Sequence, residues 1–289
     1  MSGLISAILK ISAPLLFAVT GALITEYSGA LAVFMEGAII LSAFFCTLFT
    51  IISGSQILGF IFASVLTSLI LFALALFTFK TKANPFLTGL SLNLFAAGFV
   101  PWASELFLSK RGVISFEEFL STHNFVPVNN FFPFFTALFF SVLLFLFLKF
   151  TSSGISLKYS GEAPEVLTAR GENCEKYKVL SWTAAGFFSA CAGAVLVFRL
   201  AAYTPNISAG RGWTALAAVF LGNKNPLFCA AAVLIFSSAE YVVNIMQGAF
   251  KIPSGILLSF PYVIALILFI ISHAVKKRRL ILYNADSIV

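Results

Sequence analysis

The sequence predicts an all-α fold, a polytopic transmembrane helical bundle with about nine crossings. Apolar residues make up 60% of the 289 residues, and the mean hydropathy is +1.01. Apolar runs of about 20 residues recur along the chain, which is the length that a helix needs to span a bilayer. A membrane β-barrel would instead show alternation within segments of about ten residues, and these runs lack it.

The first five predicted spans end at charged or turn-forming residues. Charge is costly in hydrocarbon, which is consistent with Lys10 before the first span and with Lys80 and Lys82 after the third. A Ser-Gly-Ser-Gln turn separates the second span from the third, and a polar stretch at 110–130 separates the fourth from the fifth. The five spans are expected at 11–27, 31–52, 57–79, 85–108 and 131–150.

Four further spans are expected at 179–203, 207–221, 227–246 and 255–275. The segment 207–221 is short for a full span and polar at both ends, which is typical of a broken or tilted helix that lines a transport pathway. The stretch from Ser28 to Gly37 is interrupted in a similar way. The family resemblance given below implies that these two segments occupy corresponding places in two related halves of the chain.

Residues 158–178 form a charged island between two long apolar runs. The island holds four basic and four acidic residues in a chain of which only 10% is charged. Pro164 suits a first helical turn, where its missing N–H costs nothing, and Gly171 is typical of the residue just after a helix. We therefore expect a short helix from Pro164 to Arg170, exposed to a soluble compartment.

The basic residues indicate how the chain is oriented. Lys and Arg collect at span ends and at 276–279, and loops rich in them stay in the cytoplasm. Four predicted spans separate the island from 276–279, an even number, as required if both lie inside. The five spans before the island then place the N-terminus outside and the C-terminus inside. The net charge of +7 is explained by this topology, and we expect no nucleic-acid partner.

Polar side chains inside apolar runs are the candidates for contact with a solute, because they are costly there. Glu240 and Asn244 are four residues apart, which places them on one face of a helix. The amide of Asn93 offers both a donor and an acceptor, which suits a nucleobase edge or a sugar hydroxyl. Glu36 and Trp213 complete the set. Each polar group equally suits a hydrogen bond between helices, and Trp213 suits an interfacial anchor as well as stacking on a base.

Four stretches of the chain carry motif-like patterns: 14–17 with Gly21, Glu26, Ser28, Gly29, Glu36 and Gly37; Asn84 with 88–94; 167–173; and 210–219 with Gly222, Asn225 and Pro226. Together they resemble motifs of the permeases of ABC importers for simple sugars and nucleosides, a branched-chain-type permease family. The similarity is greatest to the branch paired with basic-membrane-lipoprotein receptors. Thr168, Arg170 and Cys174 depart from the coupling motif of that family.

The resemblance implies a single permease domain, residues 1–289, in the bacterial cytoplasmic (inner) membrane. Its loop at 151–178 would couple transport to a cytoplasmic ABC ATPase subunit. A second permease subunit would form a heterodimer with this chain, and an extracytoplasmic substrate-binding lipoprotein would deliver nucleosides, with sugars or riboflavin as alternative solutes. The coupling residues would be Pro164, Glu165, Leu167, Arg170, Gly171, Glu172 and Asn173.

The motifs that the sequence lacks argue against an enzyme. It contains no G-x-x-x-x-G-K-[ST] phosphate loop, so ATP is expected only in the partner and no cofactor is expected here. Two histidines and four cysteines show no metal-site or disulfide spacing. The residues leave open an ion-driven secondary transporter with Glu36 and Glu240 as titratable groups, and a membrane scaffold that transports nothing.

Overall fold

The computed structural model describes residues 2–118, 127–128 and 130–249. This part of the chain confirms the all-α prediction, with one two-residue strand pair and one short 3-10 helix, Phe116–Glu118, besides the α-helices. The α-helices are α1 (Ser2–Tyr27), α2 (Met35–Ser53), α3 (Gln56–Lys80), α4 (Pro85–Leu108), α5 (Phe132–Phe150), α6 (Ser152–Glu162), α7 (Pro164–Ala169), α8 (Cys174–Leu200), α9 (Arg211–Leu221) and α10 (Pro226–Ala249).

Seven of the described helices are long and apolar enough to cross a membrane, namely α1, α2, α3, α4, α5, α8 and α10. The seventh predicted span, 207–221, is instead the short helix α9, which begins only at Arg211. The ninth predicted span, 255–275, lies outside the described residues. The predicted number of about nine crossings is therefore approximate.

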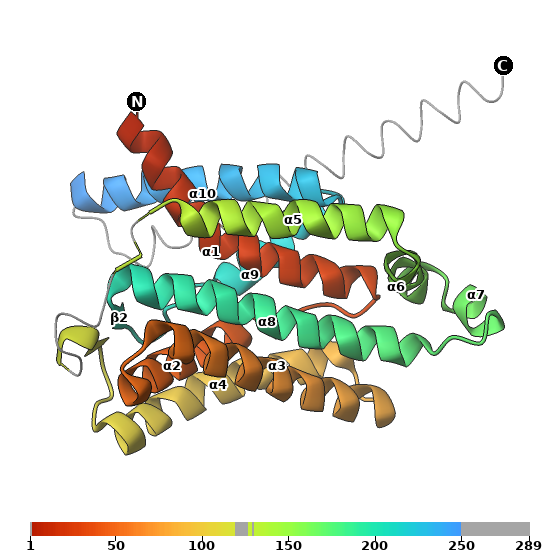
Figure 1. The fold of residues 1–289 in the computed structure, drawn as a ribbon, viewed down its shortest axis with the longest axis horizontal. Coiled ribbons are helices and arrows are strands. Elements are labelled where there is room, and N and C mark those ends of the chain that lie inside the picture. The colour runs from red at the N-terminus through yellow and green to blue at the C-terminus, as the bar shows by residue number, and fades with distance from the viewer. Residues whose placement is uncertain (1, 119–126, 129, 250–289) are drawn as a thin grey trace.

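Helices α1 and α8 lie at the centre of the bundle (Figure 1), with α5 and α10 packed on α1 and with α2 and α3 packed on α8. Small residues allow this close packing, as is common between membrane helices. A Cβ atom added at Gly186 of α8 would lie 2.7 Å from the Cα atom of Ser68 on α3. By contrast, many large apolar side chains of α3 and α4 are exposed, which suits contact with lipid.

Two helices begin inside the bundle rather than at its ends. The non-helical segments 28–34 and 204–210 precede α2 and α9, respectively, and Gly37 and Gly212 place the first turns of these helices against buried backbone. From there α2 runs toward the end that carries α3's first residues, and α9 runs toward the end that carries α6 and α7. Non-helical backbone at membrane depth is tolerated where protein or a cavity surrounds it. We call α2 and α9 the half-helices because each begins inside the bundle, although α2 is still long enough to cross a membrane.

The charged island is built on two short helices at one end of the bundle. Figure 1 shows α6 end-on beside the end of α1, with α7 beyond it. The predicted helix at Pro164 is confirmed as α7, and Gly171 follows it in the left-handed conformation, with φ of +78°. Helix α6 was not predicted. At the opposite end, β1 (Ile114–Ser115) pairs antiparallel with β2 (Ala202–Tyr203).

Substitution of Gly193, on α8, tests the close packing of the core. A Cβ atom at this position would lie 2.4 Å from the hydroxyl oxygen of Ser42 and 2.8 Å from the backbone nitrogen of Ala43, both on α2. We expect Gly193→Val to lower the free energy of unfolding by about 1–3 kcal/mol, because overpacking displaces α2. Thermal unfolding of the detergent-solubilised protein measures the effect. Gly98→Val is the control, since its added Cβ atom would meet nothing within 4 Å; equal stability of the two variants would contradict the packing described.

Candidate functional site at the junction of the half-helices

Glu36 joins the beginnings of the two half-helices. It lies in the first turn of α2, and its two carboxylate oxygens accept hydrogen bonds from the backbone N–H groups of Gly210 and Gly212, each at 2.8 Å. The first N–H groups of a helix have no partner within it, and they carry the positive end of the helix dipole. The buried carboxylate of Glu36 therefore caps α9 while belonging to α2.

Glycine is required where the half-helices meet. A Cβ atom at Gly212 would lie 2.3 Å from the backbone nitrogen of Glu36, and Gly210 has a φ of +81°. Side chains avoid both that contact distance and that backbone conformation. The Gly-x-Gly sequence at 210–212 therefore lets α9 begin directly against α2.

Asn93 of α4 caps α2 in a similar way. Its side-chain oxygen accepts a hydrogen bond from Gly37 N at 2.7 Å, and its side-chain nitrogen donates to Val33 O at 2.8 Å. No side-chain cap comes from Phe34, which precedes the helix. Asn93 thus replaces a local cap with one from a distant part of the sequence. The two polar candidates Glu36 and Asn93 lie together, and both bond within the chain.

A partly buried ion pair adjoins this junction. The guanidinium of Arg211, the first residue of α9, forms a salt bridge with the carboxylate of Glu240 on α10, and the two side chains are 16% and 25% exposed. Arg211 also donates to Ser208 O at 3.2 Å. Two buried polar atoms here, Arg211 Nε and Ser208 Oγ, have no hydrogen-bond partner among the described residues. Ionisable groups at membrane depth are functional candidates, because their burial is costly.

Sequence reasoning did not select Arg211 as a site residue. The available signal was an arginine in the otherwise apolar segment 207–221, opposite an acid in the next span. Sequence spacing does not show that the two side chains meet, because they are 29 residues apart and lie on different helices.

The other two solute candidates are not buried. Asn244 follows Glu240 by about one turn on α10 and is exposed, and Trp213 on α9 is 40% exposed. The structure therefore divides the five candidates into two groups. Glu36 and Asn93 hold the junction, whereas Glu240, Asn244 and Trp213 lie where another molecule can reach them.

The candidates of the island have distinct surroundings. Leu167 is fully buried, whereas Pro164, Glu165 and Arg170 are exposed. The carboxylate of Glu172 accepts a hydrogen bond from the Tyr177 hydroxyl. Gly171 follows the C-cap of α7, and Asn173 caps α8 by accepting a hydrogen bond from Glu175 N at 2.8 Å. Leu167 thus anchors α7, and its neighbours present a polar surface.

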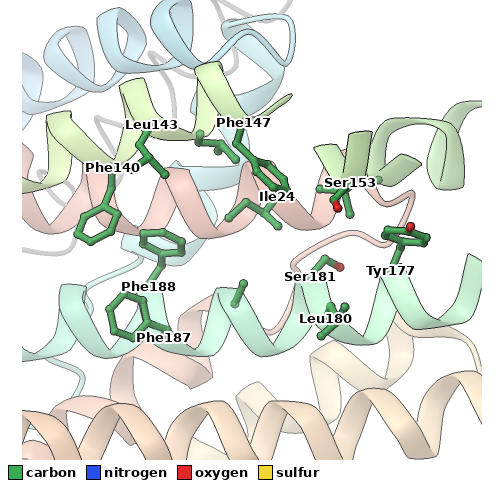
Figure 2. A pocket seen from close by; sticks show the side chains of 13 residues that line it. Ile24, Phe140, Leu143, Phe147, Ser153, Tyr177, Leu180, Ser181, Phe187 and Phe188 are labelled. Atoms are coloured by element: carbon green, nitrogen blue, oxygen red, sulfur yellow. The ribbon is translucent and has the colours of Figure 1, made fainter. Parts of the chain in front are cut away.

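The cavity of about 390 Å³ between α5 and α8 is a poorer candidate for a polar solute. Figure 2 shows Phe140, Phe187 and Phe188 gathered on one side of it, with the hydroxyl groups of Ser153, Tyr177 and Ser181 toward the other side. Polar ligands need several converging polar groups, which this lining does not offer. Among the described residues, no group of three metal-ligating side chains gathers.

Known proteins are similar in sequence to most of this chain. A family described as "Branched-chain amino acid transport system / permease component" matches residues 4–273. The guanosine ABC transporter permease protein NupQ of Bacillus subtilis is 26% identical over 251 residues, which are 78% of this chain and 77% of NupQ. The nucleoside ABC transporter permease protein NupC of Lactococcus lactis is 25% identical over 286 residues, 91% of this chain and 90% of NupC.

A solved structure shares the fold. The structure described as PsaBC from Streptococcus pneumoniae in complex with Fab superposes with a TM-score of 0.50, over 92% of this chain and 89% of that chain. The two sequences are only 15% identical, so this likeness concerns the fold alone.

Substitution of Glu36 tests the capping of α9. We expect Glu36→Ala to lower the free energy of unfolding by about 2–6 kcal/mol, because two buried N–H groups lose their acceptor at about 1–3 kcal/mol each. Glu36→Gln keeps one acceptor oxygen and should lose less. Thermal unfolding measures the loss of stability. Hydrogen exchange at residues 210–214 shows whether the first turn of α9 is the part that is destabilised.

The control for this experiment is Glu105→Ala. The side chain of Glu105 is 50% exposed and pairs with an exposed arginine, so its removal should change stability little. Unchanged exchange at 210–214 in Glu36→Ala would exclude the capping role.

Proposed function

Because this chain belongs to the family of permease components of branched-chain amino acid transport systems, we propose that it is the permease subunit of an ATP-driven ABC importer for nucleosides. The observation that carries the nucleoside assignment is the alignment with NupQ and NupC over most of all three chains. The junction of the half-helices supports transport, because interrupted helices that meet within a bundle are typical of solute sites in transporters.

The accessible residues near the junction suit a nucleoside. Such a solute carries ribose hydroxyls, a base edge with donors and acceptors, and an aromatic face. Asn244 can bond to a base edge, Glu240 can accept from hydroxyls, and the indole of Trp213 can stack on a base. Glu36 and Asn93 support these residues by fixing where α9 begins. Sugars and riboflavin share the hydroxyl groups and are the alternative solutes.

Polar groups at membrane depth also suggest where a second subunit packs. Asn244 is exposed on α10, within a helix of membrane-spanning length, and lipid is an unfavourable environment for an amide. We propose that a second permease chain, different from this one, covers this face of α10 and encloses the pathway. An extracytoplasmic lipoprotein delivers the solute to this pair of permeases.

The end of the bundle with α6 and α7 faces the cytoplasm in this proposal, which places the N-terminus outside and the C-terminus inside. The exposed residues Pro164, Glu165 and Arg170 contact the ABC ATPase. Buried Leu167 transmits the movement of the ATPase to the bundle. ATP is bound by that partner, since the sequence of this chain has no phosphate loop.

Substitution of Asn244 tests the pathway. We expect Asn244→Ala to raise the KM for nucleoside uptake by about tenfold, because one hydrogen bond to a desolvated solute is lost. Uptake of labelled guanosine and uridine by cells or proteoliposomes measures it, with ribose and riboflavin as competitors. Ile245→Ala, at the next position, which is also exposed, should leave KM unchanged. Equal KM values for the two variants would remove Asn244 from the pathway.

A charge reversal at Glu172 tests the coupling surface. We expect Glu172→Arg to lose the ATPase from the purified complex and to keep the second permease, because the change removes the bond to Tyr177 and reverses the charge beside α7. Affinity purification with mass spectrometry measures both partners. Glu175→Arg, at an exposed position on α8, is the control. An ATPase that still co-purifies with Glu172→Arg would refute the assignment of this surface to ATPase binding. Uptake that needs no ATPase but is abolished by a protonophore would favour an ion-driven transporter.

A further inference from the structure

Helix α6 touches the end of α1 through two glycines. A Cβ atom added at Gly161 would lie 2.4 Å from Tyr27 O and 2.6 Å from Gly29 N, and one added at Gly29 would lie 2.8 Å from the Cα atom of Gly161. Side chains do not fit at these distances, and Gly29 also has a φ of +77°. The backbone of α6 therefore lies directly on the connection between α1 and α2, with no flexible side chain between them.

From Gly29 the chain reaches Glu36 through a packed segment. Phe34 is fully buried, and its ring centroid lies 4.5 Å from that of Trp182 on α8. The carbonyl of Val33 accepts a hydrogen bond from a side chain of α4. Close-packed segments transmit displacement because they have little room to yield. A shift at Gly29 thus reaches Glu36, which holds the N-terminal end of α9.

The C-terminal end of α9 is also bonded to the end of α1. Lys224, in the turn after α9, donates from its backbone nitrogen to Val219 O at 3.1 Å. Its carbonyl accepts a hydrogen bond from the Tyr27 hydroxyl, and its ammonium lies 2.8 Å from a carboxylate oxygen of Glu26. Both partners belong to the last turn of α1, beside Gly29. The segment that α6 touches therefore holds both ends of α9.

We propose that Gly29 and Gly161 are positioning residues for transport, through which α6 moves α9 as one unit. The inference rests on the function proposed above and adds the route by which the ATPase reaches the pathway. When the ATPase shifts α7, and with it α6, which packs on α7, the Gly29–Gly161 contact moves the end of α1 as well. Glu26 and Tyr27 then displace the C-terminal end of α9 through their bonds to Lys224, and Glu36 displaces its N-terminal end. This motion changes the position of Arg211, and so of its ion pair with Glu240 beside the solute.

The test is the ratio of solute transported to ATP hydrolysed in the complete transporter, reconstituted in proteoliposomes. We expect Gly161→Ala and Gly29→Ala to keep assembly and ATP hydrolysis near the wild-type level and to lower the ratio by about tenfold. The controls are Gly98→Ala for the helical position and Gly54→Ala for the left-handed one, since neither added Cβ atom meets anything within 4 Å. A purely structural role would instead lower assembly and hydrolysis together.

The charge pair at the other end of α9 tests the same route without altering a glycine. Glu26→Lys places two cations together and should lower the ratio, and the double variant Glu26→Lys/Lys224→Glu should restore it. This result stands even where Gly161→Ala fails to assemble. A wild-type transporter without ATP-dependent uptake would overturn the proposed function itself. If the wild type shows ATP-dependent uptake and Glu26→Lys has the same ratio of solute transported to ATP hydrolysed, this inference alone would be overturned.

Discussion

The structure depends on satisfying the backbone of a helix that begins inside the bundle. Such a beginning exposes N–H groups where no water is available to pair with them, and each unpaired group is costly. The carboxylate of Glu36 meets this need for α9, and the amide of Asn93 meets it for α2. The close approach of α2 to α4 at Gly37, and of α9 to α2 at Gly212, follows from this requirement, because each acceptor must reach the backbone directly.

The charges around α9 follow from the same arrangement. Arg211 lies at the positive end of the α9 dipole, where a cation is unfavourable, and the carboxylates of Glu36 and Glu240 both lie close to offset it. At the other end the dipole favours a cation, and Lys224 lies there with Glu26 as its partner. The short helix therefore has charged side chains and their partners at both ends, in addition to the apolar side chains that it buries.

The long helices were predictable from sequence because hydrocarbon thickness sets their length and charge marks their ends. The short helix α7 was predictable because Pro164 and Gly171 act locally. Helix α6 was not, since its sequence, SSGISLKYSGE, is rich in serine and glycine and its helical form depends on packing against α1 and α5. The five candidate solute residues were selected from the sequence only as polar or aromatic side chains in apolar runs. Their division into junction and accessible groups was not predictable, because it depends on helices far apart in the sequence.

The distribution of the cysteines makes the island accessible to spectroscopy. Cys46, Cys191 and Cys229 are buried, whereas Cys174 is partly exposed at the start of α8. Its sulfur donates a hydrogen bond to Pro164 O at 3.4 Å, across the base of α7. A thiol-reactive fluorophore or spin label would therefore attach preferentially at the point where α7 joins the bundle. The natural sequence thus provides a single reporter of how α7 moves during a cycle, with no cysteine to remove first.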